Sequence, residues 1–159
     1  MQRLKKIYIE TSVFNFVFAD NDIEKQQHAI RLFEEINEGK YEPYTSQMVV
    51  GELLRAEEPK RSKMLSLISE NGIVAIPADE ETARLAAIYV TEGIIPAKYG
   101  TDALHITSTS VNDLDFIVSY NFRHIVKMKT IMMTESINLR EGYRRIGIYS
   151  PTEVIENDD

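Results

Sequence analysis

The stretch that decides the fold is Lys6-Ile7-Tyr8-Ile9-Glu10-Thr11-Ser12-Val13, near the start of the chain. Its first four residues are mostly β-branched or aromatic, so they predict a short strand, and Glu10 closes that strand. Thr11 or Ser12 can cap a short helix that follows directly and runs to Ala19. A strand that passes straight into a helix is the unit that α/β folds repeat.

The rest of the chain continues this alternation. Apolar runs predict strands at 41–45, 73–76, 116–119 and 146–149, and helices are predicted at 23–38, 46–56, 59–71, 80–92 and 101–112. Residues 131–142 are ambiguous, and we expect a loop followed by a helix. Such alternation predicts a parallel sheet with helices on both faces. Ligands of these folds bind beyond the carboxyl ends of the strands.

Composition narrows the class of protein. The 159 residues favour a single domain over 1–159, and the absence of cysteine excludes disulfides, Cys-based zinc sites and thiol catalysis. The net charge of −7 means that any contact with nucleic acid needs a local basic patch or a metal ion. No apolar run reaches the roughly 20 residues of a membrane helix. We therefore expect a cytoplasmic protein without membrane contact.

Four acidic or polar residues lie near the predicted ends of strands or starts of helices: Glu10, Glu52, Asp102 and Asn121. If their strands are neighbours, the four side chains can converge at one edge of the sheet. Mg²⁺ and Mn²⁺ prefer oxygen ligands of this kind. Without a cation, two carboxylates ~4 Å apart repel by ~4 kcal/mol at an effective dielectric of ~20.

Each residue also has a purely structural interpretation. Glu52 can pair with Arg55 on an exposed helix face, and Asp102 can be a charge that the helix dipole favours. Asn121 is a good helix cap, and Glu10 can be an exposed strand end. No one of the four is specific alone, so their order and local contexts decide between the two interpretations.

The contexts are Ile7-Tyr8-Ile9-Glu10-Thr11-Ser12-Val13, Val49-Val50-Gly51-Glu52-Leu53, Thr101-Asp102-Ala103-Leu104-His105-Ile106 and Asp115-Phe116-Ile117-Val118-Ser119-Tyr120-Asn121-Phe122-Arg123-His124. In this order and at these separations they resemble the four motifs of PIN domains, the fold of VapC-type toxin ribonucleases. The resemblance covers about residues 6 to 150.

The resemblance implies a three-layer α/β/α sandwich with a parallel central sheet. It also implies an endoribonuclease that depends on Mg²⁺ or Mn²⁺, cleaves RNA, and is often a homodimer paired with an antitoxin protein. Carried over to this sequence, the resemblance implies that Glu10, Glu52 and Asp102 are metal ligands. Asn121 would hold a further ligand position or orient a water. The hydroxyls beside the metal would come from Thr11, Ser12 and Ser119.

Two positions depart from the family pattern, because Glu10 and Asn121 stand where an Asp is usual. Three formal negative charges then remain instead of four. Two hypotheses follow: an active metal-dependent endoribonuclease, or a degenerate PIN domain that binds RNA or a protein without cutting. A phosphoacceptor receiver domain is excluded, because Thr11 and Ser12 occupy the place of its acidic pair.

Other polar residues could surround the site. Arg55, Lys98, Arg123 and Lys127 could bind RNA phosphates at its rim, although dispersed surface charge explains each of them as well. His105 follows Asp102 by one helical turn on the same face, and we expect it to pack against the sheet rather than bind a metal.

Overall fold

The computed structural model describes residues 3–156. Its sheet has five parallel strands in the order β3-β2-β1-β4-β5. The strands are β1 (Lys5–Ile9), β2 (Tyr41–Ser46), β3 (Val74–Ile76), β4 (Phe116–Val118) and β5 (Gly147–Tyr149). The first strand is therefore central, and later strands are added on either side of it. This confirms the predicted α/β class with a parallel sheet.

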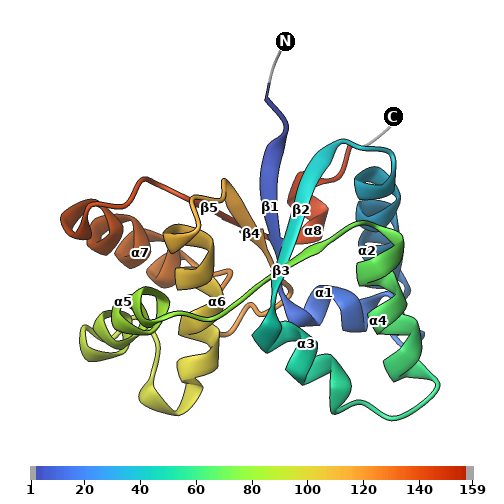
Figure 1. Cartoon of the computed structure of the whole chain (residues 1–159), viewed down its shortest axis with the longest axis horizontal. Coiled ribbons are helices and arrows are strands. Elements are labelled where there is room, and N and C mark those ends of the chain that lie inside the picture. Colours follow the sequence, from blue (N-terminus) through green and yellow to red (C-terminus); the bar gives the residue numbers. More distant parts are fainter. Residues whose placement is uncertain (1–2, 157–159) are drawn as a thin grey trace.

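Helices cover both faces of the sheet, as Figure 1 shows. On one side lie α5 (Glu80–Thr91), the short 3-10 helix η1 (Ala97–Tyr99), α6 (Gly100–Val111) and α7 (Met128–Glu141). On the other side lie α1 (Thr11–Phe16), α2 (Ile23–Asn37), α3 (Gln47–Leu54), α4 (Lys60–Glu70) and α8 (Pro151–Val154). The arrangement is the predicted three-layer α/β/α sandwich.

The centre of the core is β1. Ile7, Tyr8 and Ile9 each have 0% exposed surface, because helices cover both faces of a parallel sheet. On α2 the predicted apolar face is confirmed, since Ala29, Leu32, Phe33 and Ile36 are all buried. β1 is thus held rigidly from both sides, and the residue that follows it has a fixed position.

Two predicted elements differ from the structure. The first helix ends at Phe16 instead of Ala19, and residues 131–141 all belong to α7, which begins at Met128 and ends before Gly142. The face that α7 buries is largely polar: Thr130, Thr134 and Asn138 are buried beside Ile137. Asn138 donates a hydrogen bond to Ser110 Oγ (2.8 Å), so its burial is compensated. An apolar periodicity could not show such a helix.

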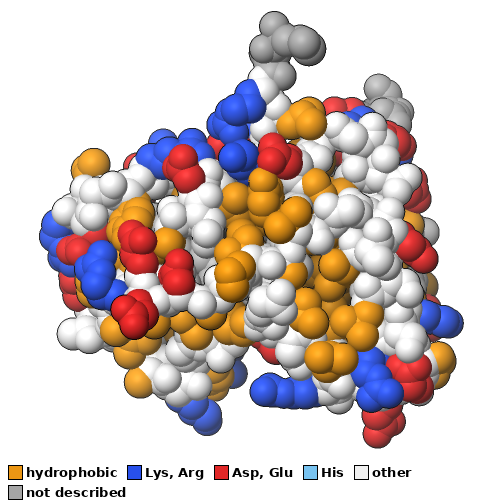
Figure 2. All heavy atoms as spheres, in the orientation of Figure 1, with side chains coloured by type: hydrophobic (Ala, Val, Ile, Leu, Met, Phe, Trp, Pro, Cys, Tyr) orange, Lys and Arg blue, Asp and Glu red, His pale blue; other side chains and the backbone are white. Residues whose placement is uncertain are grey.

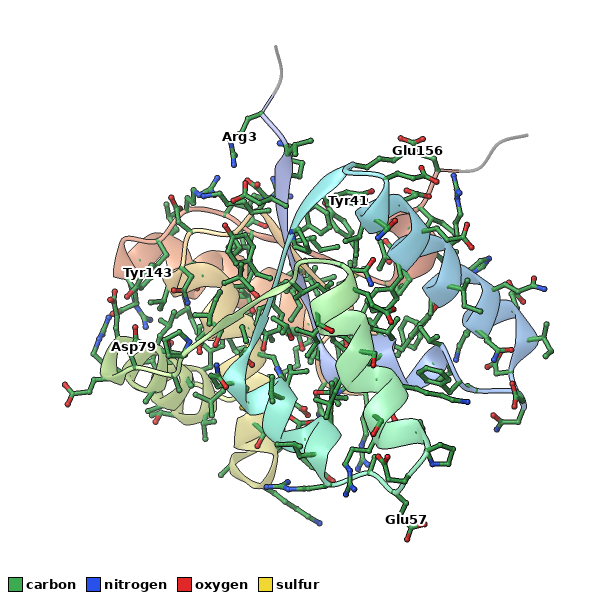
Figure 3. The ribbon with its side chains drawn as sticks, turned by 45° about the vertical axis from the view of Figure 1, so that its right-hand side comes forward. Arg3, Tyr41, Glu57, Asp79, Tyr143 and Glu156 are labelled. Atoms are coloured by element: carbon green, nitrogen blue, oxygen red, sulfur yellow. The ribbon has the colours of Figure 1, made fainter. Side chains whose placement is uncertain are left out.

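The end of the described chain is tied to the start of β2. The Tyr41 hydroxyl donates to the Val154 carbonyl (2.8 Å), and Lys40 Nζ lies 2.8 Å from Glu156 Oε2. Figure 3 labels Tyr41 and Glu156 close to each other in the upper part of the view. Across residues 3–156, the structure contains no helix with the length and apolar character needed to span a bilayer.

Candidate active site

Two predicted site segments meet at the carboxyl ends of β1 and β4. These strands are neighbours, with Ile9 paired to Val118, and the Glu10 amide donates to the Val118 carbonyl (3.2 Å). Glu10 therefore lies directly beside Ser119, and Asn121 follows two residues later. We call this end of the sheet the carboxyl edge, and the opposite end the amino edge.

Hydroxyl groups hold the Glu10 carboxylate in place. Glu10 is 6% exposed, and its Oε1 accepts hydrogen bonds from Ser12 Oγ (2.5 Å) and Ser119 Oγ (2.7 Å). The Ser12 hydroxyl in turn accepts a bond from the Tyr120 amide (2.8 Å). The expectation that Ser12 and Ser119 lie around an acidic ligand agrees with this geometry: both contact Glu10 itself.

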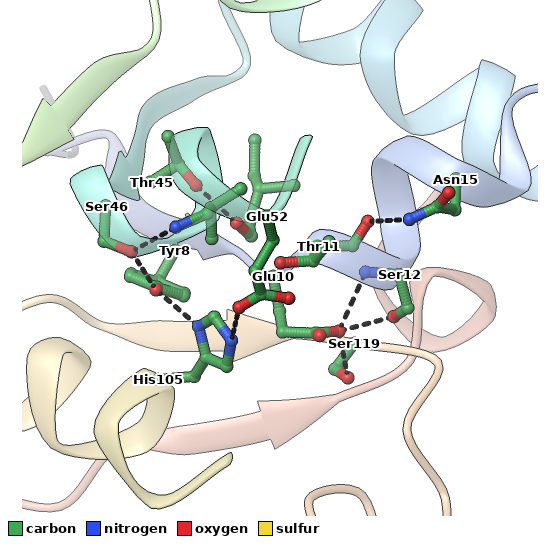
Figure 4. A network of polar contacts seen from close by, with 12 residues as sticks. Tyr8, Glu10, Thr11, Ser12, Asn15, Thr45, Ser46, Glu52, His105 and Ser119 are labelled. Carbon is green, nitrogen blue, oxygen red and sulfur yellow. Dashed lines mark hydrogen bonds and ion pairs between the residues drawn. The ribbon is translucent and has the colours of Figure 1, made fainter. Parts of the chain in front are cut away.

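Glu52 comes from α3 and faces a histidine of α6. Its Oε1 lies 3.1 Å from His105 Nε2, and His105 Nδ1 lies 2.7 Å from the Tyr8 hydroxyl. The Tyr8 hydroxyl also contacts Ser46 Oγ at 2.8 Å. Figure 4 shows this chain of contacts running from Ser46 to Glu52, next to Glu10. His105 is 1% exposed, which agrees with its expected packing against the sheet.

The protonation pattern follows from this chain. An ionised Glu52 can only accept, so His105 donates to it through Nε2, while the Tyr8 hydroxyl donates to Ser46 Oγ and lies against His105 Nδ1. Burial opposes ionisation of Glu52, but the hydrogen bonds from His105 and Thr11 outweigh it and lower its pKa below the usual value. The Thr11 hydroxyl is buried there and completes no hydrogen bond of standard geometry. Glu52 is thus a fixed, ionised carboxylate.

Asp102 lies in the first turn of α6, opposite Asn121. Burial raises the pKa of Asp102; a hydrogen bond from the Asn121 side chain opposes this rise, and the charge of Glu10 adds to it. The Asn121 Oδ1 accepts a bond from the His124 amide (2.9 Å). Asn121 therefore caps the turn that follows β4 with its oxygen, as its structural interpretation expected. Its amide side faces Asp102.

The structure thus brings Glu10, Glu52, Asp102 and Asn121 to one end of the molecule, and we call these four residues the acid cluster. Within residues 3–156, no Lys or Arg forms an ion pair with any of its three carboxylates. Nor does any trio of His, Asp or Glu side chains in that range form a group that could hold a metal as the side chains stand. Each carboxyl is turned toward its own partner: Glu10 to serines, Glu52 to His105 and Asp102 to Asn121.

The donor set nevertheless suits a hard cation. Carboxylate and hydroxyl oxygens are the ligands that Mg²⁺ and Mn²⁺ prefer, and the Thr11 hydroxyl is an oxygen still without a hydrogen bond of standard geometry. Mg²⁺ keeps several waters and needs only one or two protein carboxylates. Glu10, Glu52 and Asp102 therefore supply oxygen ligands of the kind that such an ion takes.

Exposed cations surround this end of the molecule. Arg55 caps α3 and helps to lower the pKa of Glu52, and Arg123 lies above the ring of Tyr99 (5.3 Å). Figure 2 shows an indentation at the lower edge of the molecule, between the positions of α3 and α6, with Lys or Arg side chains visible on both sides. Cationic side chains are thus present at this end of the molecule, against a net charge of −7, and their role as a rim for phosphates stays a prediction.

Sequence reasoning missed Tyr8 and Ser46, which complete the chain behind Glu52. Tyr8 lies inside an apolar strand, where an aromatic residue is expected for packing alone, so no local pattern indicates a role for its hydroxyl. A comparison with known proteins adds nothing to this geometry, since no family model and no curated protein matches the chain.

Proposed function

We propose that this chain is a metal-dependent endoribonuclease of the PIN type, which hydrolyses RNA phosphodiesters with Mg²⁺ or Mn²⁺. The observation that carries the proposal is the acid cluster. Three carboxylates from segments far apart in the sequence lie at the carboxyl edge, where α/β folds bind ligands, and no Lys or Arg of the described chain forms an ion pair with them. A functional cation explains such an arrangement, whereas a structural cluster would be paired.

The chain's own residues would prepare the site. Ser12 and Ser119 fix the Glu10 carboxylate, and His105 fixes Glu52. Asn121 holds Asp102 by its amide, and the cations of the rim attract phosphates. When bound, the ion supplies polarisation of a phosphodiester and a water of lowered pKa.

A second candidate is a degenerate PIN domain that binds RNA or a protein without cutting. Asn121 favours it, because its side-chain oxygen already accepts the His124 amide and no fourth carboxylate is present. Pairing with an antitoxin and formation of a homodimer stay predictions under either function.

The test is cleavage of a fluorescent single-stranded RNA by purified protein, with millimolar Mn²⁺ or with EDTA. We expect cleavage only with the metal, and a loss of at least about 100-fold in Asp102→Asn, since the ligand charge is removed. Glu80→Gln is the matched control, because Glu80 is also an acid in the first turn of a helix but is exposed and remote. It should cut like the wild type.

A second readout separates the two candidates. A metal that binds only the folded protein at about 100 times its Kd stabilises it by about 2.7 kcal/mol, so Mn²⁺ should raise the melting temperature. RNA binding without cleavage and without this rise supports the degenerate domain. Cleavage that Asp102→Asn retains would show a contaminating nuclease and overturn the proposal.

A further inference from the structure

Two groups of aromatic rings and cations flank the acid cluster. The first surrounds Tyr99, a partly exposed residue of η1 that lies three positions before Asp102. Its ring centroid lies 4.2 Å from that of His124, with an angle of 32° between the planes. Arg123 and Lys98 each lie near the Tyr99 ring, at 5.3 and 5.7 Å from its centroid.

The second group surrounds Phe122, whose surface is 47% exposed. Lys25 Nζ lies 5.4 Å from the Phe122 ring, 5.4 Å from Phe16 and 6.0 Å from Tyr120. The Tyr120 hydroxyl donates to the backbone carbonyl of Lys25 (2.9 Å) and so holds the backbone from which the Lys25 side chain extends. An exposed aromatic ring therefore carries a positive charge beside its face.

One turn, residues 120–124, contributes to both groups and carries Asn121 between them. The Tyr120 amide binds Ser12, which holds Glu10, and the Asn121 amide donates to Ser119 Oγ (2.9 Å). Phe122 leaves this turn toward Lys25 of α2, whereas Arg123 and His124 leave it toward Tyr99 of η1. The acid cluster thus has an aromatic ring with adjacent cations on each side.

We propose that Tyr99 and Phe122 are stacking residues for unpaired bases on either side of the acid cluster, so that single-stranded nucleic acid is the class of ligand. This inference rests on the proposed function for the cutting step, but not for binding. A duplex hides its base faces, whereas a single strand presents both a π-face for each ring and a phosphate for each cation. A purely apolar protein partner would not use the cations at these rings.

Charge supports the same choice of ligand. With a net charge of −7, long-range attraction of a polyanion is absent, so binding must come from short-range contacts. Base stacking on an aromatic side chain contributes about 1–3 kcal/mol for each base. Two such platforms, with Lys25, Lys98 and Arg123 for phosphates, can hold a strand across the cluster.

The experiment measures binding by fluorescence anisotropy in EDTA, so that no cleavage interferes. The ligands are a single-stranded RNA 10-mer, the same strand in a duplex, and an abasic phosphodiester of equal length. Tyr99→Ala and Phe122→Ala should each weaken binding of the single strand about tenfold, and the Trp variants should restore it. Duplex and abasic ligands should bind at least about tenfold more weakly than the single strand.

Tyr149→Ala is the matched control, since Tyr149 is a 39% exposed aromatic residue on the edge strand β5 whose ring packs against Phe116 at the start of β4. Its backbone carbonyl accepts the Ser119 amide (3.0 Å), a bond that the Ala variant keeps. Its affinity for RNA should stay within twofold of the wild type, and melting curves check that every variant folds. Equal binding of the abasic ligand, or unchanged affinity in both Ala variants, would overturn the proposal. So would a protein partner whose binding Phe122→Ala abolishes while RNA affinity is unchanged.

The outcome also separates this inference from the proposed function. Stacking-dependent binding in EDTA, together with no cleavage in Mn²⁺, would support the platforms and refute the nuclease. Cleavage in Mn²⁺, together with unchanged RNA affinity in the Ala variants, would support the nuclease and refute the stacking platforms.

Discussion

The two edges of the same sheet treat their acids in opposite ways. At the amino edge, Asp115 precedes β4 and is enclosed by two arginines: Arg3 Nη2 lies 2.9 Å and Arg144 Nη2 lies 3.3 Å from its Oδ1. The Lys6 amide also donates to Asp115 (2.7 Å). Burial opposes ionisation, but these contacts dominate and lower the pKa of Asp115 to about 2.

At the carboxyl edge, no Lys or Arg of the described chain forms an ion pair with the acids, and Glu52 contacts His105. Glu10 is held by serines and Asp102 by an amide, and the pKa of Asp102 is raised by burial and by Glu10. The difference teaches how to distinguish a structural acid from a functional one. Asp115 has two arginines in ion-pair contact, whereas no Lys or Arg of the described chain is in such contact with the acid cluster, which leaves it able to accept a cation from solution.

The largest expected effect separates the two edges by activity. Glu10→Gln should lower the rate of Mn²⁺-dependent RNA cleavage by at least about 100-fold, because it removes a ligand charge while its amide oxygen can still accept from Ser12 and Ser119. Asp115→Asn should leave the rate within threefold. Single-turnover cleavage assays with both variants test this; equal losses in the two would remove the distinction between the edges.

The second effect concerns the free energy of unfolding, and here the variant at the amino edge should have the larger effect. Asp115→Asn should lower the free energy of unfolding by about 1–2 kcal/mol at pH 7, a value reduced for screening at the exposed arginines. Asp102→Asn should change it by less than about 0.5 kcal/mol, because the lost helix-dipole attraction offsets the relief from burial and from Glu10. Urea unfolding of both variants provides the measurement.

The pH dependence of this second effect follows from the lowered pKa of Asp115. The stabilisation is fully present above the unfolded pKa of 3.8 and is lost as the pH falls through the folded value of about 2. The difference in stability between wild type and Asp115→Asn should therefore shrink from pH 4 to pH 2. A difference that stays constant over this range would mean that the carboxylate is not what stabilises the fold there.

The fold and most of the acid cluster could be predicted because they depend on local patterns. A run of apolar residues that ends in Glu10 identifies both a strand and its end, and parallel strands place their ends at one edge. The same reasoning found Asp102 and Asn121. It needed no knowledge of which helix packs where.

Partners that lie far apart in the sequence could not be predicted in this way. Arg3 and Asp115 are 112 positions apart, and no local pattern connects them. Tyr8 and His105 meet because α6 packs on the face of β1, which only the tertiary structure decides. Glycine at 147 is a similar case: a Cβ there would clash with the Tyr149 ring, a restriction that the sequence does not reveal.

The third effect tests whether the acid cluster lacks one charge. Asn121→Asp keeps an oxygen for the His124 amide and adds a carboxylate facing Asp102, so it should tighten Mn²⁺ binding about tenfold, or about 1.4 kcal/mol. The gain should vanish in the Asp102→Asn background, because both residues would act on one ion. Isothermal titration of the four proteins measures this coupling. Unchanged affinity in Asn121→Asp, beside a clear loss in Asp102→Asn, would remove Asn121 from the site.

The smallest effect tests the chain of contacts behind Glu52. Burial raises the pKa of Tyr8, so its hydroxyl stays protonated; it donates to Ser46 Oγ and lies 2.7 Å from His105 Nδ1. Tyr8→Phe leaves that buried nitrogen without a partner and should cost about 1 kcal/mol of stability. Because His105 then positions Glu52 less firmly, cleavage should fall about threefold, and Mn²⁺ affinity should fall with it.

Tyr41→Phe is the control for this last prediction, since it also removes a single tyrosine hydroxyl with one good acceptor, the Val154 carbonyl (2.8 Å), at the other end of the molecule. It should lower stability by a similar amount and leave cleavage and metal affinity unchanged. If the two variants lose stability equally and neither loses activity, the Tyr8 hydroxyl only stabilises the core. If Tyr8→Phe alone loses metal affinity, the chain from Tyr8 through His105 sets the position of a carboxylate at the carboxyl edge. Glu52 would then be positioned by a chain of hydrogen bonds, whereas Asp115 is positioned by two arginines.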